Sequence, residues 1–564
     1  METPPADRDP RPGRTRPDKV ERPVPPTPSD ATRWGGLPFE VRMLDPEAKP
    51  VVRDAPKALP TFYVADRILV GKRVDRKDTQ SFLDDAAAQL GWQLEPEEED
   101  PRTVGLRHGV LSFKITVLPK VAAQPPDAYV LLQNARALSG SVSVLADYGL
   151  DHVITTREVN PYPFESPHPF ETPHPFETPH PFETPHPFET PHPFETPHPF
   201  ETPHPAGGTY SAPIATYGSP GWGGRQPIAH IGPRPARREG DDMPGRRPVV
   251  AVLDSGCYPH PWLDGVVSHT VTLDGKPVGY VDPWSDPETW GDLEGPLDGV
   301  IDTVSGHGTF IAGLVHQTAP DADIVSWRVV PSEGVLVEKD WIATLAQIEE
   351  LVSRHVNGDP TGHPVEVLNL SMGYYHETPA DIAFDGELGA ILDDLSAHGT
   401  IIVCSAGNDG VSRPSYPAAF GPWETGERPV DSTKTVPIVS VGATNPNGTD
   451  ALFSNTGPWV RVYAQGAALM STMPPFQGGY QPMARTVVAD ATGKNLRTRE
   501  SIDPDDFTGG FAVWSGTSFS APVVAGRLAR ALTGTMPATG AADTAAAARQ
   551  RAWAAVEAVT PLRR

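Results

Sequence analysis

The C-terminal half of the chain contains apolar runs separated by longer amphipathic stretches. Residues 249–253 read Val-Val-Ala-Val-Leu, and such a run is typical of a strand buried on both faces of a parallel sheet. Residues 341–356 repeat apolar side chains with the period of a helix. Alternating strands and helices predict an α/β fold, a parallel sheet with helices on both faces. Further strands are expected at 322–330, 365–370, 401–404 and 436–441.

Residues 34–159 carry shorter elements of both kinds. A strand, a helix, more strand, a second helix and a closing strand follow one another, which predicts a small α+β domain of the ferredoxin-like type. Asp78 is expected to cap the first helix and Gly91 to stop it. The strands are expected at 62–64, 68–70, 111–117 and 152–155, and the helices at 78–90 and 127–138.

A proline-rich linker is predicted at 160–219, between this domain and a larger C-terminal domain at 220–564. Within the linker, residues 163–204 form seven hexapeptides, six of which read Pro-Phe-Glu-Thr-Pro-His. Two prolines in six residues exclude helix and sheet interior, so polyproline II or coil is expected. A semi-rigid spacer is favoured, and a docking ladder for a partner remains an alternative. Zinc chelation is disfavoured because successive histidines would lie about 19 Å apart.

Other stretches complete the predicted organisation. Residues 1–33 are rich in Pro, Arg and Asp and are expected to be disordered. Residues 470–510 are polar and rich in Gly and Pro, which favours a surface insertion. The Ala-rich tail at 541–564 is expected to be helical.

Charge and composition narrow the class of protein. The formal net charge of -25 argues against a nucleic-acid partner. Two cysteines give no disulfide framework. The N-terminus lacks the apolar core of a signal peptide, and no run is long enough to span a membrane. A cytoplasmic protein is therefore expected, with secretion still open if the start of the chain is misassigned.

Three distant segments supply the groups of a nucleophilic site. Ser518 lies in Ser-Gly-Thr-Ser-Phe-Ser-Ala-Pro, ahead of an apolar helix whose first turn Pro522 would suit. Asp254 ends the first buried strand, where open α/β sheets place their sites. His307 stands between glycines at the start of another apolar helix. A serine nucleophile needs a base and a carboxylate that orients the base, and these residues supply both.

The order Asp254, His307, Ser518 resembles that of the subtilisin-like serine proteases, the subtilases, which are the standard example of this order. Two further segments support the resemblance. Ser-Ala-Gly-Asn at 405–408 is similar to the family's oxyanion-hole segment, which makes Asn408 the matching asparagine. Leu-Asn-Leu-Ser-Met-Gly at 368–373 resembles the edge segment that pairs with substrate backbone.

The resemblance implies further roles. A protein or peptide substrate is expected to pair with Ser371, Met372 and Gly373. Ala406, Gly407 and Ser415 would line the pocket for the residue before the scissile bond, and their small size would admit a large apolar side chain. No cofactor is expected to be required. The family often binds calcium, but the acidic loop at 282–302 gives no assignable site and equally suits a solvated surface.

The N-terminal domain also has a counterpart in the family. Subtilase prodomains have a similar size and element order and precede the catalytic domain, so residues 34–159 are expected to act as an inhibitor of the protein itself. A freestanding binding domain is the alternative. For the whole chain, an active endopeptidase is favoured because a scaffold has no need of complete catalytic residues. A catalytically idle subtilase fold whose repeat array binds a partner is the competing hypothesis.

Overall fold

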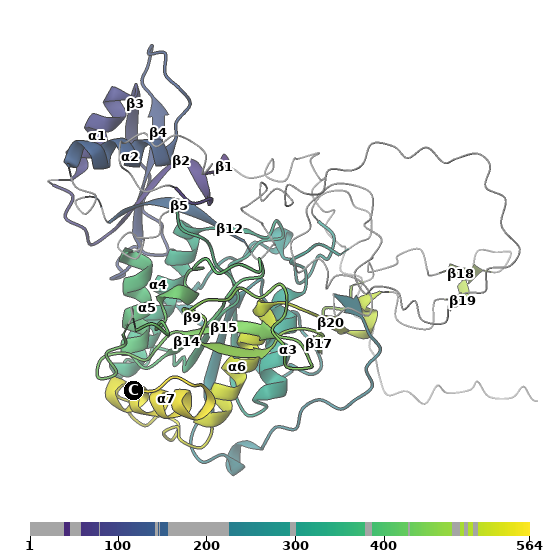
Figure 1. Ribbon diagram of the computed structural model, residues 1–564. Helices are drawn as coiled ribbons and strands as arrows, with labels where there is room; N and C mark the ends of the chain where they lie inside the picture. Colours follow the sequence, from purple (N-terminus) through teal and green to yellow (C-terminus); the bar gives the residue numbers. More distant parts are fainter. Residues whose placement is uncertain are drawn as a thin grey trace, which may run out of the picture.

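The computed structural model describes two packed units (Figure 1). The predicted disordered segment at 1–33 and the repeats at 163–204 lie outside the described residues, as does Asp78. Described are residues 39–44, 58–77, 79–140, 145, 147–155, 225–293, 301–377, 386–426, 429–476, 486–489, 495–499 and 506–564.

A parallel sheet forms the centre of the C-terminal unit, as predicted. Its strand order is β16-β15-β14-β13-β7-β11-β8, and each neighbouring pair is parallel. The strands are β7 (Val249–Asp254), β8 (Val267–Ser268), β11 (Asp323–Arg328), β13 (Val367–Leu370), β14 (Ile401–Ser405), β15 (Val439–Thr444) and β16 (Val462–Gln465).

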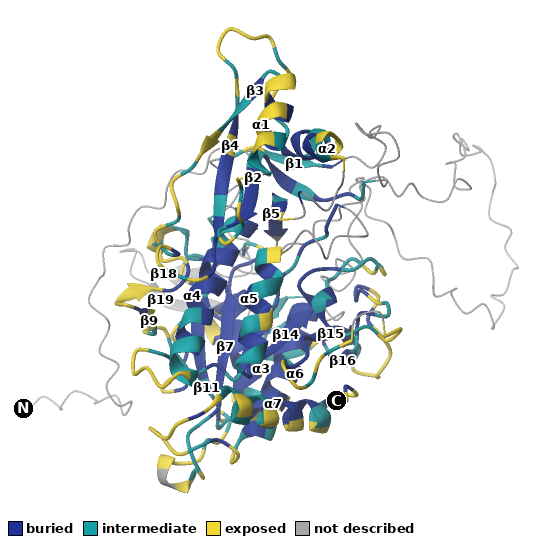
Figure 2. Ribbon diagram, turned by 90° about the vertical axis from the view of Figure 1, so that its left-hand side faces the viewer, coloured by how far each residue is buried: buried dark blue, intermediate teal, exposed yellow. Residues whose placement is uncertain are grey.

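Helices cover both faces of this sheet, and Figure 2 shows its strands buried between them. Residues of β7 alternate between two cores: Val249 and Leu253 pack into one, and Val250 and Val252 into the other. The apolar run predicted from the sequence is therefore a strand with two buried faces. The first core is closed by α4 (Glu338–Val356) and α5 (Gly386–Ala397), and the second by α3 (His307–Thr318), α6 (Thr517–Leu532) and α7 (Ala545–Val559).

The N-terminal unit is an antiparallel sheet with two helices packed on one face. Ile68, Val70 and Leu150 point from the sheet into a core that the helices close. Asp127 caps the second helix by accepting a hydrogen bond from the backbone N–H of Val130. The elements are β1 (Val41–Met43), β2 (Phe62–Gly71), α1 (Gln80–Gln89), β3 (Trp92–Pro96), β4 (Val110–Val117), α2 (Ala128–Ser139) and β5 (Tyr148–Thr155).

The two units share a sheet edge and a core. Strand β12 (Val335–Val337) of the C-terminal unit pairs antiparallel with β5, so that Leu336 lies opposite Ile154 (Figure 1). The second face of the N-terminal sheet contributes Leu69, Val110 and Ile154 to the core that contains α4 and α5. Alternate residues of β2 therefore serve the domain's own core and the contact with the other unit.

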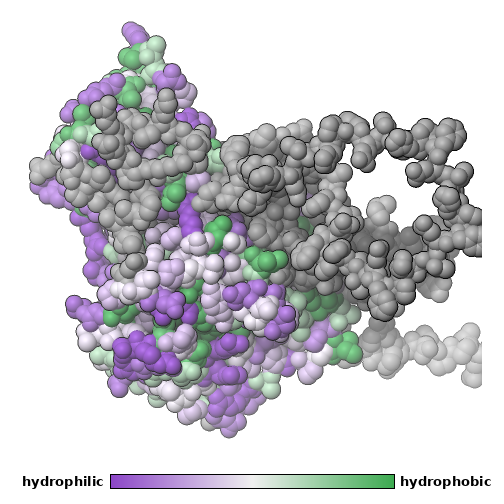
Figure 3. Space-filling model, viewed as in Figure 1, coloured by the Kyte–Doolittle hydropathy of each residue, from purple (hydrophilic) through white to green (hydrophobic). Residues whose placement is uncertain are grey.

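Polar contacts surround this apolar junction. Lys339, in the first turn of α4, donates from Nζ to Glu97 Oε2 at 3.1 Å and from its backbone N–H to Asp151 Oδ1 at 3.0 Å. Arg102 of the N-terminal unit pairs with Asp340. Elsewhere, hydrophilic and hydrophobic residues are interspersed over the visible face of the described residues (Figure 3).

Two predictions were wrong in part. Pro522 is the sixth residue of α6, not part of its first turn, because the helix begins at Thr517. Residues 470–510 are not wholly a surface insertion: Met473, Phe476 and Phe507 are buried in the second core. This region includes β17 (Leu469–Thr472), which pairs with β20 (Phe511–Trp514), which in turn pairs with β6 (Gln226–Pro227).

Two small hairpins lie outside the main sheets. They are β9 (Thr272–Leu273) with β10 (Lys276–Pro277), and β18 (Thr486–Ala489) with β19 (Asn495–Arg499). Among the helices of the described residues, none combines the length and the apolar character that a membrane crossing requires.

Candidate active site

The carboxyl ends of three neighbouring strands bring the candidate residues together. Leu370 in β13 lies opposite both Leu253 in β7 and Cys404 in β14. Asp254 is the last residue of β7, and Ser371 directly follows β13. Both therefore lie at the same edge of the sheet. This is the edge at which ligands bind in open α/β folds.

Asp254 and His307 form a buried pair. His307 Nδ1 and Asp254 Oδ1 lie 2.7 Å apart, and Asp254 is fully buried. The backbone N–H and the hydroxyl of Ser255 also donate to Asp254 Oδ1, at 2.8 and 3.1 Å. These contacts fix the orientation of the carboxylate, which leaves Nε2 as the nitrogen of His307 that can act on a nucleophile.

The glycines beside His307 permit the close packing that this pair needs. A Cβ on Gly308 would lie 2.0 Å from the carbonyl oxygen of Gly256, in the loop after Asp254. Gly306 has φ +81° and caps α3, and a Cβ there would lie 2.4 Å from Met473 Cε. Only glycine at 308 lets the start of α3 approach the Asp254 loop so closely.

Ser518 is the second residue of α6, and the helix is adapted to it. Pro522 has no backbone N–H, so the carbonyl of Ser518, four residues earlier, receives no helical hydrogen bond. The hydroxyl of Ser371 donates to that carbonyl at 2.9 Å. This hydrogen bond takes the place of the missing helical bond and joins the start of α6 to the residue after β13.

Ser518 and His307 are not hydrogen-bonded in this conformation. Ser518 Oγ donates to the carbonyl of Ser371 at 3.3 Å. The ring of Phe519, the next residue, packs 5.2 Å from the ring of His307. Both members of the pair are described, and no contact joins the hydroxyl to the imidazole.

Asn408 also contacts the start of α6. Its Oδ1 accepts hydrogen bonds from the backbone N–H and the hydroxyl of Thr517, both at 2.8 Å. Because the N–H of Thr517 can only donate, these contacts identify the oxygen of the amide. The Nδ2 group faces the other way, 3.7 Å from the position of a Cβ on Gly516. The sequence predicted this residue, but not its bonds to Thr517.

The predicted substrate-binding residues follow β13 and β14. Ser371 and Met372 are buried. Gly373 packs against the carbonyl of Tyr416, from which an added Cβ would be only 2.6 Å. Ala406 is buried, and Gly407, with φ +103°, donates its N–H to Thr517 Oγ1 at 3.1 Å. Ser415 Oγ lies 3.0 Å from the Cβ position of Gly373.

The model of the subtilase family matches residues 245–557, more than half of the chain. The chain belongs to the subtilase family. The matched range contains Asp254, His307, Asn408 and Ser518, and it places the central sheet and its helices in the subtilisin-like α/β fold.

Individual relatives are more distant. The serine protease AprX of Bacillus subtilis (strain 168) is 24% identical over 309 residues, which cover 51% of this chain and 58% of AprX. An intracellular serine protease of Paenibacillus polymyxa is 25% identical over 300 residues, covering 50% of this chain and 66% of that protein. The subtilase thus spans about half to two thirds of the length of these relatives. A solved cold-adapted subtilisin-like serine proteinase gives a TM-score of 0.31 at 20% identity, covering 52% of this chain and 77% of its own.

Glu288 is a residue of the site that the sequence did not reveal. It lies in the acidic loop at 282–302, yet it is only 2% exposed. Its Oε1 lies 2.5 Å from Ser255 Oγ and accepts from the N–H of Gly308 at 3.1 Å. Its Oε2 accepts from Thr309 Oγ1 at 2.5 Å. Glu288 therefore links the loop after Asp254 to the first turn of the His307 helix.

Burial raises the pKa of Glu288 to about 8, and Asp286 and Asp254 add to the rise. The folded subtilase then holds a proton on Glu288 between its ordinary pKa of 4.5 and about 8, while the unfolded chain does not. The state that binds more protons is destabilised as pH rises, so Glu288 contributes stability that is present below pH 4.5 and is lost as pH approaches 8.

Glu288→Gln, in a Ser518→Ala background that prevents proteolysis, should change this pH dependence. Glutamine retains an oxygen for Ser255 and Gly308 and stays neutral. The melting temperature of the variant minus that of the Ser518→Ala parent should be larger at about pH 8.5 than at about pH 5. Differential scanning calorimetry at both pH values measures the change. If the melting temperatures of the two proteins changed equally between these pH values, the raised pKa assigned to Glu288 would be wrong.

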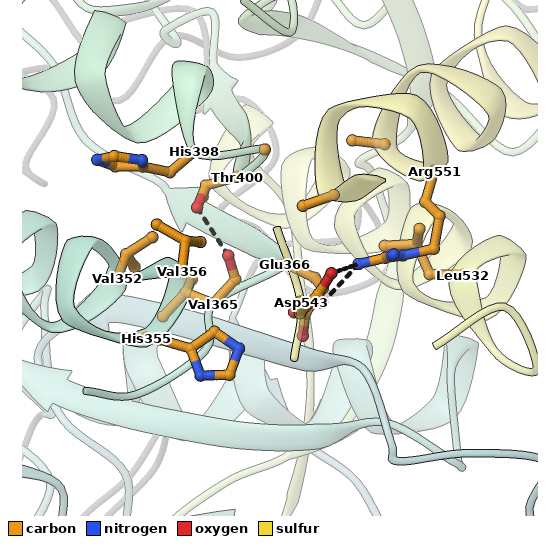
Figure 4. Close-up of a pocket in the computed structure, with 13 residues that line it drawn as sticks. Val352, His355, Val356, Val365, Glu366, His398, Thr400, Leu532, Asp543 and Arg551 are labelled. Carbon is orange, nitrogen blue, oxygen red and sulfur yellow. Dashed lines mark hydrogen bonds and ion pairs between the residues drawn. The ribbon is translucent and has the colours of Figure 1, made fainter. Parts of the chain in front are cut away.

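A small pocket elsewhere in the subtilase does not belong to this site. Its cavity of about 20 Å³ has room for a single water molecule. It lies at the opposite edge of the sheet, where Val365 precedes β13 and Thr400 precedes β14, and Arg551 pairs with Asp543 in its wall (Figure 4). The candidate residues all lie at the carboxyl edge.

Proposed function

We propose that this subtilase is a serine endopeptidase that hydrolyses peptide bonds through Asp254, His307 and Ser518. The observation that carries the proposal is the buried 2.7 Å contact between His307 and Asp254, beside the first turn of the helix that bears Ser518. The family match supports the reaction class. No cofactor is required for this chemistry, because the three side chains supply nucleophile, base and orienting carboxylate.

The reaction begins when the Ser518 hydroxyl leaves the carbonyl of Ser371 and turns toward His307. His307 Nε2 takes the hydroxyl proton as Ser518 Oγ attacks the substrate carbonyl carbon. The imidazolium is stabilised by Asp254 and then gives its proton to the leaving amine. A water molecule, activated in the same way, releases the acyl group and restores Ser518.

Two donors are proposed to stabilise the oxyanion. Ser518 is the second residue of α6, so its backbone N–H has no partner within the helix. Asn408 uses its oxygen on Thr517, which directs Nδ2 away from that residue. Both N–H groups lie at the start of α6, where the helix dipole also favours negative charge.

The substrate is proposed to be a protein or peptide that binds as an extended strand along Ser371, Met372 and Gly373. Ala406, Gly407 and Ser415 are proposed to border the pocket for the residue before the scissile bond. Their small side chains favour a large apolar residue there.

The N-terminal domain is proposed to be a ferredoxin-like prodomain that inhibits the enzyme. Its contacts lie next to the proposed substrate strand, where Tyr374 and Tyr375 follow Gly373. The ring of His152 in β5 stacks on Tyr374 at 4.8 Å, and Thr61 Oγ1 donates to the carbonyl of Tyr375 at 2.5 Å. A domain held there restricts the approach of an extended substrate.

Covalent labelling of Ser518 by a fluorophosphonate tests the proposed activity. The wild-type chain should be labelled and Ser518→Ala should not, because only an activated serine reacts. Peptide mapping identifies the labelled residue. An unlabelled wild-type chain, including after removal of the N-terminal domain by limited proteolysis, would favour the idle scaffold.

Intact mass of the same two preparations tests the N-terminal control. The wild type should be cut once in cis between about residues 156 and 247, mostly outside the described residues, because the tether raises the local concentration of the cleavage site. Ser518→Ala should keep its full mass. Equal full-length masses with an active wild type would show that the domain is not a processed prodomain.

A further inference from the structure

His152 of the N-terminal unit is buried in the junction with the catalytic domain. Its Nδ1 lies 2.7 Å from Glu338 Oε2, at the start of α4, and its Nε2 lies 3.0 Å from Glu377 Oε2. His376 Nδ1 lies 2.8 Å from the same Glu377 oxygen. Strand β5, the start of α4 and the segment after β13 therefore bring two imidazoles and two carboxylates together. We call His152, Glu338, His376 and Glu377 the junction cluster.

The donor atoms of the junction cluster converge in the manner of a metal site. One donor atom each from His152, His376 and Glu377 lies within 4.8 Å of the others, and all three residues are buried. Glu338 holds the other nitrogen of His152, as carboxylates do for metal-bound histidines. The second oxygen of Glu377 has no hydrogen-bond partner among the described residues.

We propose that the junction cluster binds a divalent transition-metal ion, with zinc as the preferred ion, through His152, His376 and Glu377. Glu338 is the carboxylate that orients His152. The ion would join the N-terminal domain to the catalytic domain, because one ligand comes from the first and two come from the second.

Charge balance supports a dication. Glu338 and Glu377 bring two carboxylates to a buried site, and a buried charge must be matched. One divalent ion with two neutral imidazoles matches them, as two protons on the histidines would. Each imidazole nitrogen that binds the ion gives up its proton, so metal uptake should release protons.

The donor types favour zinc over calcium or magnesium. Imidazole suits zinc and its neighbours, whereas calcium and magnesium take oxygen ligands. Donors around a tetrahedral zinc lie about 3.3 Å apart, given bonds of about 2.0–2.1 Å. The separations of 3.0 and 2.8 Å at Glu377 Oε2 need to widen by only a few tenths of an ångström.

His108 provides an internal comparison. It also enters the catalytic domain between carboxylates, with Nδ1 3.0 Å from Glu387 and Nε2 2.8 Å from Asp394. Here Arg107 lies 3.0 Å from Asp394 and Arg73 lies 3.9 Å from Glu387. His108 converges with Glu349 and Asp394, so this second cluster has one imidazole where the junction cluster has two. The neighbouring arginines repel a cation, so this histidine should join the domains without metal.

The test is zinc content of the full chain in the Ser518→Ala background, produced without a polyhistidine tag. After equilibration with zinc and dialysis against a weak chelator, inductively coupled plasma mass spectrometry counts the ions. His152→Ala and His376→Ala should each lose one zinc per chain, and His108→Ala should lose none. Zinc held by histidines of the repeat array is common to all variants and cancels in the difference.

Two further measurements separate ligation from folding. Glu338→Gln should weaken zinc binding about 10–100-fold while keeping the site, as expected for an outer carboxylate. Cobalt bound to the Ser518→Ala parent should show the visible absorption of a four-coordinate ion, which His376→Gln should abolish. Equal zinc content in all variants, or parent-like cobalt spectra in His376→Gln, would show that the junction cluster holds protons only.

Discussion

Peptide hydrolysis should fall about a millionfold in Ser518→Ala and by a similar factor in His307→Ala, a magnitude that comes from subtilisin itself. The two losses should be alike because nucleophile and base act as a unit: an unactivated serine attacks as poorly as no serine. The double variant should therefore be no worse than either single one. Turnover of a chromogenic peptide, measured after removal of the N-terminal domain, gives the three values.

Ser520→Ala is the matched control for Ser518→Ala. Ser520 lies on the same helix, is also buried, and donates to the carbonyl of Thr517 at 2.9 Å. Its loss should leave turnover nearly unchanged. Both variants should show the circular dichroism of the wild type. If Ser518→Ala retained more than a few per cent of wild-type hydrolysis, Ser518 would not be the nucleophile.

Asn408→Ala should lower kcat about 100- to 1000-fold with little change in KM, again a magnitude measured on subtilisin. The oxyanion exists only in the transition state and the intermediate, so loss of its donor does not weaken substrate binding. Weak activity should remain, because the backbone N–H of Ser518 still serves the oxyanion. Steady-state kinetics on the processed enzyme separates kcat from KM.

Asn408→Asp tests whether Asn408 donates a hydrogen bond to the oxyanion or only holds Thr517 in position. Aspartate can still accept the two hydrogen bonds from Thr517, but it has no N–H to offer and brings a negative charge toward the oxyanion. Asn408→Asp should therefore lose at least as much activity as Asn408→Ala. Asn447→Ala, on an exposed turn, is the control and should be unaffected. Recovery of activity in Asn408→Asp would mean that Asn408 acts only by holding Thr517.

The junction cluster lies beside the segment that follows the proposed substrate strand. Tyr374 follows the proposed substrate strand directly, and its ring stacks on His152 of the junction cluster. The proposed inhibition and the proposed zinc site are separable by experiment: hydrolysis and intact mass test the first, and metal content tests the second.

The sequence by itself determined the central architecture. The run at 249–253 predicted a strand buried on both faces, and β7 sends alternate residues into two cores. The positions of Asp254 at the end of a strand and of His307 and Ser518 at the starts of helices were also readable. Each of these features is a property of one element, because periodicity and end signals are local. The domain boundaries and the roles of the site residues stay predictions.

Only the tertiary structure decided how distant segments meet. The three-residue strand β12 is too short to show an alternating pattern, and its partner β5 lies in another domain. Glu288 belongs to a loop whose acidity suggested a solvated surface, and only packing between Ser255 and Thr309 buries it. The carbonyl that Pro522 leaves unbonded is satisfied by Ser371, from a different strand. Such contacts depend on the folded core, because a buried polar group must find its partner wherever the packed chain brings one.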